Sequence, residues 1–215
     1  MVHYLLMPLH RHYDYGFGAT GEAFKNAADR LMEPGNEERL LNGHLPINFL
    51  FRHSIELFLK SLIIVIHKRL KLSYGNEPFD STPKILVDAK WKPIHQVHSI
   101  ALLYGYFKSI LVNHKPEFDS ISRTNWTDIP VDLDEWISAI DGADSTGTFF
   151  RYPFTRDLGS DEGKSSFKED QSQGMLSKMN DGGKYVKAFV VLMTVTISLT
   201  HSSTIMIHWQ TFNLP

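Results

Sequence analysis

Three charged residues stand four positions apart within an otherwise apolar stretch, and their types and spacing suit a polar site. Arg52, Glu56 and Lys60 fall on one face of a helix, because residues four apart are neighbours on a helical surface. Ions among apolar residues are costly unless oppositely charged groups pair with them. The spacing therefore predicts a paired network, which either fixes the register of the helices or forms a polar site between helices or subunits.

Histidines supply the second set of candidates. A histidine can serve as general acid or base in metal-independent RNA cleavage, with an arginine stabilising the phosphorane. Among the 11 histidines of the chain, His53, His98 and His201 could take the first role, and Arg52 or Arg151 the second. The candidate catalytic residues are Arg52, His53 and Glu56. The candidate binding residues are Arg52, His53, Glu56, Lys60, His98, Arg151, Tyr152 and His201.

Familiar ligand motifs occur only in incomplete form. Gly16–Gly21 matches GxGxxG, but no strands follow at βαβ spacing, so it predicts a flexible turn before a helix. Gly159–Ser165 resembles a P-loop with a spacer one residue short, and it predicts a solvated loop. The pairs His10/His12 and His95/His98 fit no metal pattern, and the chain contains no cysteine. We therefore expect no metal and no cofactor.

Composition limits the partners and the compartment. A net charge of −2 and a pI near 6.6 give no global basic field, so we predict no DNA binding. The N-terminus has no secretion signal, which favours the cytoplasm. Residues 188–209 are apolar and long enough to span a bilayer. Their hydroxyl groups and two histidines favour a buried helix instead, so we predict no membrane association.

The candidate residues must be positioned by helices, because strand patterns are scarce. Residues 73–94 read as a loop, and residues 157–182 as a mobile one. The sequence therefore predicts a single all-α domain over residues 1–215, an antiparallel bundle of four to five helices with a long loop before the C-terminal helix. The expected helices are Thr20–Glu33 with Thr20 as its cap, Leu45–Leu72, His95–Asn113, Val131–Ala143 and about Gly183–Trp209.

Three segments resemble the HEPN superfamily, the helical-bundle domains of prokaryotic toxin and defence systems. They are PINFLFRHSIELFLKSLI (Pro46–Ile63), the start of the next helix (His95–Leu103) and DSTGTFFRYPF (Asp144–Phe154). The resemblance covers about two-thirds of the chain. It implies an antiparallel helical bundle that forms a homodimer and acts on RNA or on a partner protein.

Nuclease members of that superfamily carry an arginine followed after four to six residues by a histidine. Here the spacing occurs only from Arg39 to His44, in a turn before the long helix. Whether the chain is an enzyme therefore stays open at the level of sequence. One hypothesis is a dimeric HEPN-like protein that binds RNA or a protein partner. The alternative is a metal-independent ribonuclease with a non-standard arginine–histidine site.

Overall fold

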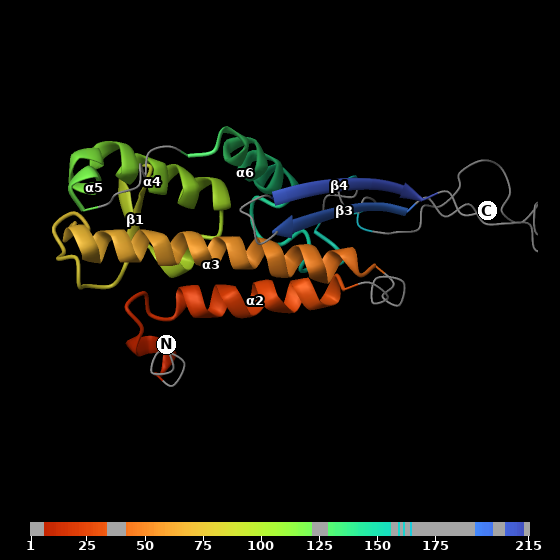
Figure 1. Cartoon of the computed structure of the whole chain (residues 1–215), viewed down its shortest axis with the longest axis horizontal. Coiled ribbons are helices and arrows are strands. Elements are labelled where there is room, and N and C mark those ends of the chain that lie inside the picture. The colour runs from red at the N-terminus through yellow and green to blue at the C-terminus, as the bar shows by residue number, and fades with distance from the viewer. Residues whose placement is uncertain are drawn as a thin grey trace, which may run out of the picture.

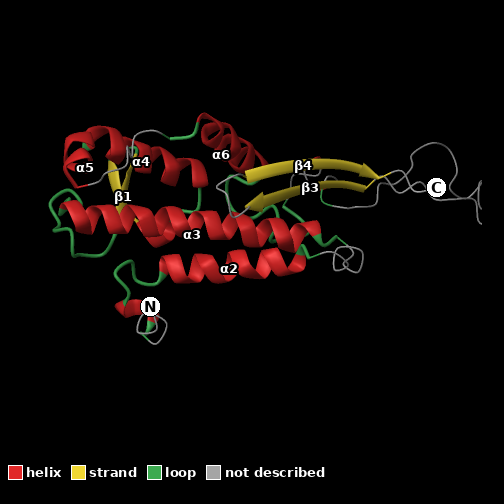
Figure 2. Cartoon of the chain, in the orientation of Figure 1, coloured by secondary structure: helices red, strands yellow, loops and turns green. Residues whose placement is uncertain are grey.

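The computed structural model describes residues 7–33, 42–121, 129–155, 159, 161, 164, 192–199 and 205–212. Within these ranges the chain is mostly helical, which confirms the predicted class in coarse form, and two small antiparallel hairpins accompany the helices (Figure 2). The elements in chain order are η1 (Leu9–Arg11), α2 (Phe17–Leu31), α3 (His44–Leu70), β1 (Lys84–Val87), β2 (Lys90–Pro93), η3 (Ile94–Gln96), α4 (Ile100–Asn113), α5 (Lys115–Ile121), α6 (Val131–Ala143), β3 (Leu192–Leu199) and β4 (Ile205–Phe212).

Helix α3 is the central element, as its apolar sequence predicts. Helix α2 lies antiparallel along one side of it, while α4 and the β1–β2 hairpin cover the other (Figure 1). Ile63 and Ile64 are 0% exposed. A helix that is apolar on nearly every face must be buried on several sides, and α3 is.

The helices do not form the simple antiparallel bundle that we expected, because α3 and α4 run in the same direction. The His98 carbonyl, just before α4, contacts Arg52 early in α3, and the Tyr106 hydroxyl contacts His67 near the end of α3. After α3 ends, residues 71–99 lead back along it before α4 begins. Helix α6, in contrast, runs antiparallel to α4 (Figure 1).

Two expectations about residues 73–113 are wrong. Residues 73–94 contain the β1–β2 hairpin rather than a loop alone, and its turn carries positive φ angles at Asp88 (49°) and Ala89 (61°). Helix α4 begins at Ile100, because the Ser99 side chain accepts the Leu102 amide at 3.2 Å and caps the helix there. His95 and His98 therefore do not share a helical face.

The C-terminal helix predicted over residues 183–209 is also wrong. Residues 192–199 and 205–212 form the β3–β4 hairpin, in which Thr196 pairs with His208. The helix was predicted from polar residues that recur at steps of three and four, Thr194, Ser198, His201, Thr204 and His208, and the steps of four also fit the period of two of a strand. The run Thr194–Ile197 is entirely β-branched, which favours a strand. Residues 157–182 lie outside the described residues except for 159, 161 and 164.

Candidate functional site

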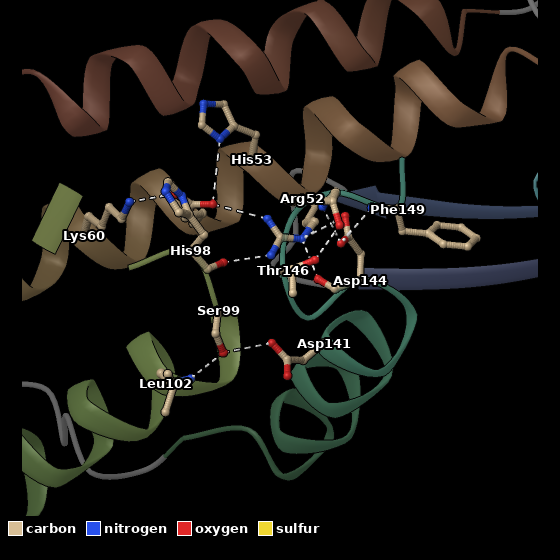
Figure 3. Close-up of polar contacts among 12 residues, drawn as sticks. Arg52, His53, Lys60, His98, Ser99, Leu102, Asp141, Asp144, Thr146 and Phe149 are labelled. Carbon is tan, nitrogen blue, oxygen red and sulfur yellow. Dashed lines mark hydrogen bonds and ion pairs between the residues drawn. The ribbon is translucent and has the colours of Figure 1, made fainter. Parts of the chain in front are cut away.

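The charged line of α3 is fully enclosed by protein. Arg52, Glu56 and Lys60 are 2%, 1% and 2% exposed, and all three have partners (Figure 3). This confirms the prediction that ions in such a helix must be paired. Their side chains lie on the side of α3 that faces the segment before α4 and the segment after α6.

Glu56 is the hub of this network, because its carboxylate contacts four basic side chains. Oε1 accepts a hydrogen bond from Lys60 Nζ at 2.7 Å and lies 3.0 Å from His98 Nδ1. Oε2 accepts from Arg52 Nη1 at 3.2 Å and lies 3.9 Å from His53 Nδ1. We refer to Arg52, His53, Glu56, Lys60 and His98 as the Glu56 cluster.

The surroundings of Glu56 determine its protonation state. Burial alone would raise the pKa of this carboxyl group. The nearby His53 ring, the charge and hydrogen bond of Lys60 and the hydrogen bond from His98 outweigh burial and lower the pKa to about 2. Glu56 is therefore a carboxylate at neutral pH, and it can accept a hydrogen bond from the Nδ1–H group of His98.

Arg52 joins three segments of the chain through its guanidinium group. Nη1 binds Glu56 on the same helix, Nη2 donates to the His98 carbonyl at 2.8 Å, and Nε donates to the Asp144 carbonyl at 2.9 Å. Nε also lies 3.4 Å from Asp144 Oδ2. With each nitrogen engaged by protein, Arg52 positions other residues and has no donor group directed to solvent.

Asp144 continues this network into the segment after α6. Its side chain is 1% exposed, and Oδ1 accepts hydrogen bonds from the Thr148 amide at 2.8 Å and the Phe149 amide at 3.1 Å. These bonds fold residues 144–149 into a tight turn that passes over Arg52. Asp144 belongs to the HEPN-like segment of the sequence, but its role in the turn was not predicted, although an aspartate just after a helix and before a glycine is a turn signal.

Gly147 is the residue that lets the turn approach Arg52. Its φ is +74°, and a Cβ placed there would lie 2.9 Å from Arg52 Nη1. Gly147→Ala is therefore expected to lower the free energy of unfolding by about 1–3 kcal/mol, measured by urea denaturation.

Gly105→Ala is the matched control for Gly147→Ala. Gly105 lies within α4, and a Cβ there would meet nothing within 4 Å. The control is expected to stabilise the protein by about 0.5–1 kcal/mol through helix propensity. Equal stability of the two variants would contradict the close approach of the turn to Arg52.

The structure describes two of the three candidate histidines, His98 and His53, and they differ in exposure and in contacts. The His98 side chain is 51% exposed while its Nδ1 contacts Glu56, so the opposite side of its ring is open to solvent. The His53 side chain is 23% exposed, and its ring packs edge-on against Phe24 and stacks with Phe49. His201 lies outside the described residues. Of the two candidate histidines that the structure describes, His98 is the one whose ring is within hydrogen-bond distance of Glu56 and is also open to solvent.

Arg151 and Tyr152 lie on the surface of the turn that Asp144 organises. The Arg151 guanidinium lies 5.3 Å from the centre of the Phe49 ring, and Phe49 in turn stacks on His53 at 5.7 Å. Tyr152 is 50% exposed. Arg151 therefore reaches the edge of the Glu56 cluster through one aromatic ring, whereas the described part of the chain records no contact from Tyr152 to the cluster.

The GxGxxG match has a structural role. Asp14 accepts the amides of Gly16 and Gly18 at 3.0 and 2.6 Å, so its carboxylate occupies the N-terminal end of α2, where a bound anion would otherwise lie. Gly16 has a φ of 85°, and a Cβ at Gly21 would lie 3.2 Å from the Phe58 ring. The turn is therefore fixed rather than flexible, and Asp14, not Thr20, supplies the cap.

The P-loop-like segment does not form a fully solvated loop either. Lys164 is 4% exposed; its ammonium group pairs with Asp161 and donates to the Tyr152 carbonyl at 2.9 Å. Asp161 in turn accepts the Thr155 amide at 2.8 Å. Lys164 and the Thr155 amide lower the pKa of Asp161 to about 2. These contacts fasten the far end of the turn that begins at Asp144.

Comparisons with known proteins add no assignment to this geometry: no family model, no curated protein and no solved structure matches the chain. In the part of the chain that the structure describes, no three histidine, aspartate or glutamate side chains converge as ligands for a metal ion. Within the same residues, no helix is both long enough and apolar enough to cross a membrane.

Proposed function

We propose that this chain is a HEPN-like helical protein of a prokaryotic defence or toxin-type system, which acts in the cytoplasm as a homodimer and binds RNA. The resemblance of Pro46–Ile63 and Asp144–Phe154 to that superfamily supports the class. A protein partner is the other ligand that the class implies, and the chemistry of the exposed residues favours RNA over it.

The observation that carries this proposal is that a buried residue, Arg52, holds two backbone segments, and that exposed polar groups lie on those segments. The Arg52 side chain fixes the backbone of His98 and the start of the 144–149 turn at once. The exposed groups beside these anchors are an imidazole, a guanidinium and a phenol, from His98, Arg151 and Tyr152. Such groups bind phosphates, sugars and bases. In this proposal Arg52, Glu56 and Lys60 hold the site, and the exposed groups contact RNA.

The direct test is the salt dependence of RNA binding, measured by fluorescence anisotropy with a labelled single-stranded RNA. Arg151→Gln is expected to weaken binding at every sequence and to reduce the slope of log Kd against log salt by about 1, because one phosphate contact is lost. Arg69→Gln is the matched control, because Arg69 is also exposed but lies at the far end of α3. Equal slopes for both variants would contradict the proposal, and light scattering would test the homodimer separately.

A second candidate, the metal-independent ribonuclease, is favoured by the Glu56–His98 pair. With Nδ1 held by Glu56, Nε2 of His98 remains free to take the proton of a ribose 2′-hydroxyl. That oxygen then attacks the adjacent phosphorus, and the bond to the 5′-oxygen breaks. The departing 5′-oxygen takes a proton from water, so the products are a 2′,3′-cyclic phosphate and a 5′-hydroxyl. Arg151 would be the arginine for the phosphorane, because Arg52 is enclosed.

The same RNA incubated with EDTA tests this candidate. Cleavage that leaves a 2′,3′-cyclic phosphate, and that falls by about 10²–10⁴-fold in His98→Ala, would assign the activity. His95→Ala is the control, because His95 is also exposed and lies only three residues away. Intact RNA after long incubation would dismiss the ribonuclease and leave the binding proposal unchanged.

A further inference from the structure

Residues 144–155 form a surface turn that is fixed at both ends, and we refer to them as the aromatic turn. At one end, Arg52 binds the Asp144 carbonyl and Asp144 binds two amides of the turn. At the other end, Lys164 donates to the Tyr152 carbonyl and Asp161 accepts the Thr155 amide and hydroxyl. His44, at the start of α3, contacts the Lys164 carbonyl at 3.0 Å and ties this end to the helix.

The outer surface of the aromatic turn is exposed although its backbone is fixed. Tyr152 is 50% and Phe154 is 62% exposed, with Pro153 between them. Rings held on a rigid backbone lose little conformational freedom when a ligand stacks on them. Arg151 is also exposed and pairs with no carboxylate in the part of the chain that the structure describes. Two exposed rings and one exposed cation therefore lie within residues 151–154 of one fixed turn.

We propose that the aromatic turn is a preformed stacking surface for unpaired bases, so that the ligand of this protein is single-stranded RNA rather than duplex. This inference rests on the proposed RNA-binding function and narrows it to a substrate class. Each ring of Tyr152 and Phe154 offers a face to one base, and stacking of this kind tolerates any sequence. Bases inside a duplex are already stacked on one another and offer no free face.

The position of the turn supports RNA over a protein partner. Arg52 binds both the Asp144 carbonyl at the start of the turn and the His98 carbonyl, so one buried group holds the turn and the segment that carries the exposed imidazole. The Arg151 guanidinium, which lies 5.3 Å from the centre of the Phe49 ring, would meet a phosphate of the stacked strand. Exposed rings alone would also suit a protein partner, whereas the guanidinium group beside them adds a donor that can bind a phosphate through two hydrogen bonds.

The experiment compares a labelled single-stranded 12-mer RNA with the same sequence annealed to its complement, using the full chain. We expect the single strand to bind at least tenfold more tightly. Tyr152→Ala and Phe154→Ala should each weaken its binding roughly five- to hundredfold, whereas Tyr152→Phe, which keeps the ring, should bind like wild type. Tyr13→Ala is the control, because Tyr13 is 54% exposed on a distant segment. Circular dichroism and thermal unfolding verify that each variant is folded.

The outcomes separate this inference from the function on which it rests. Equal affinity for single strand and duplex, or alanine variants that bind like Tyr13→Ala, would overturn the stacking surface while leaving RNA binding intact. No RNA binding by the wild-type protein would overturn both. If, in that case, Tyr152→Ala changed the oligomeric state, the aromatic turn would be reassigned to a protein contact.

Discussion

Glu56→Gln is expected to lower the free energy of unfolding at pH 7 by about 3–5 kcal/mol, because it removes the carboxylate that buried Lys60 pairs with and leaves Arg52 with Asp144 alone. Arg52 and Lys60 are each 2% exposed, and both contact the Glu56 carboxylate. The substitution keeps the size and shape of the side chain, so packing is not disturbed. Urea denaturation measures the loss, and a thermal scan should show a decrease in Tm on the order of 10 °C for a domain of this size.

Asp119→Asn provides the matched control for this experiment. Asp119 pairs with Lys115 at the same spacing of four residues on α5, but both side chains are about half exposed, at 51% and 48%. An exposed pair of this kind contributes about 0.3–0.5 kcal/mol. Each substitution removes one negative charge from a pair with a spacing of four residues, and the two sites differ in burial and in the number of basic side chains that contact the carboxylate. A loss at Glu56 no greater than that at Asp119 would show that the network contributes nothing beyond a surface ion pair.

The stability of the wild-type protein is expected to fall as the pH drops from about 4.5 to about 2. The pKa of Glu56 is lowered from an ordinary value of 4.5 to about 2 in the folded protein. In that interval the unfolded chain binds a proton at this position and the folded chain does not. Protonation therefore favours unfolding, by up to about 3 kcal/mol near pH 2, and the contribution is complete above pH 4.5.

The difference in free energy of unfolding between wild type and Glu56→Gln (the gap) separates this contribution from that of the other carboxyl groups. Asp14, whose pKa is also lowered, acts in the same direction in both proteins and cancels from the difference. Urea denaturation of both proteins at pH 6, 4.5, 3 and 2 should show the gap shrinking by about 3 kcal/mol. A gap that stays constant over this range would mean that Glu56 titrates at its ordinary value.

The features that could be predicted from sequence are those encoded by neighbouring residues. The spacing of Arg52, Glu56 and Lys60 predicts one helical face, and the cost of burying ions predicts that they are paired. Helices α2, α3 and α6 follow the apolar periodicity, with α2 beginning three residues earlier than expected. The aromatic run FFRYPF (Phe149–Phe154) likewise predicts an anchored segment, and the backbone of the aromatic turn is fixed at both ends.

The features that could not be predicted depend on contacts between distant residues or on ambiguous periods. No local pattern states that Asp144 and His98 will meet at Arg52, because 92 and 46 residues separate them from it. The direction of α4 depends on residues 71–99 leading back along α3. The prolines in that segment indicate only that the helix is interrupted, not the direction in which the chain continues. Residues 192–199 and 205–212 form strands where a helix was predicted, because polar steps of four residues fit both a helix and a strand.

The three-way connection made by Arg52 also has a consequence for the order of folding. Its side chain bonds groups 4, 46 and 92 positions further along the chain, so only the first contact can form while α3 is isolated. The other two must wait until long loops have closed, and contacts of that kind form late on the folding pathway. Substitutions that break them should therefore speed unfolding more than they slow refolding. The network would then stabilise the folded protein mainly by slowing its unfolding.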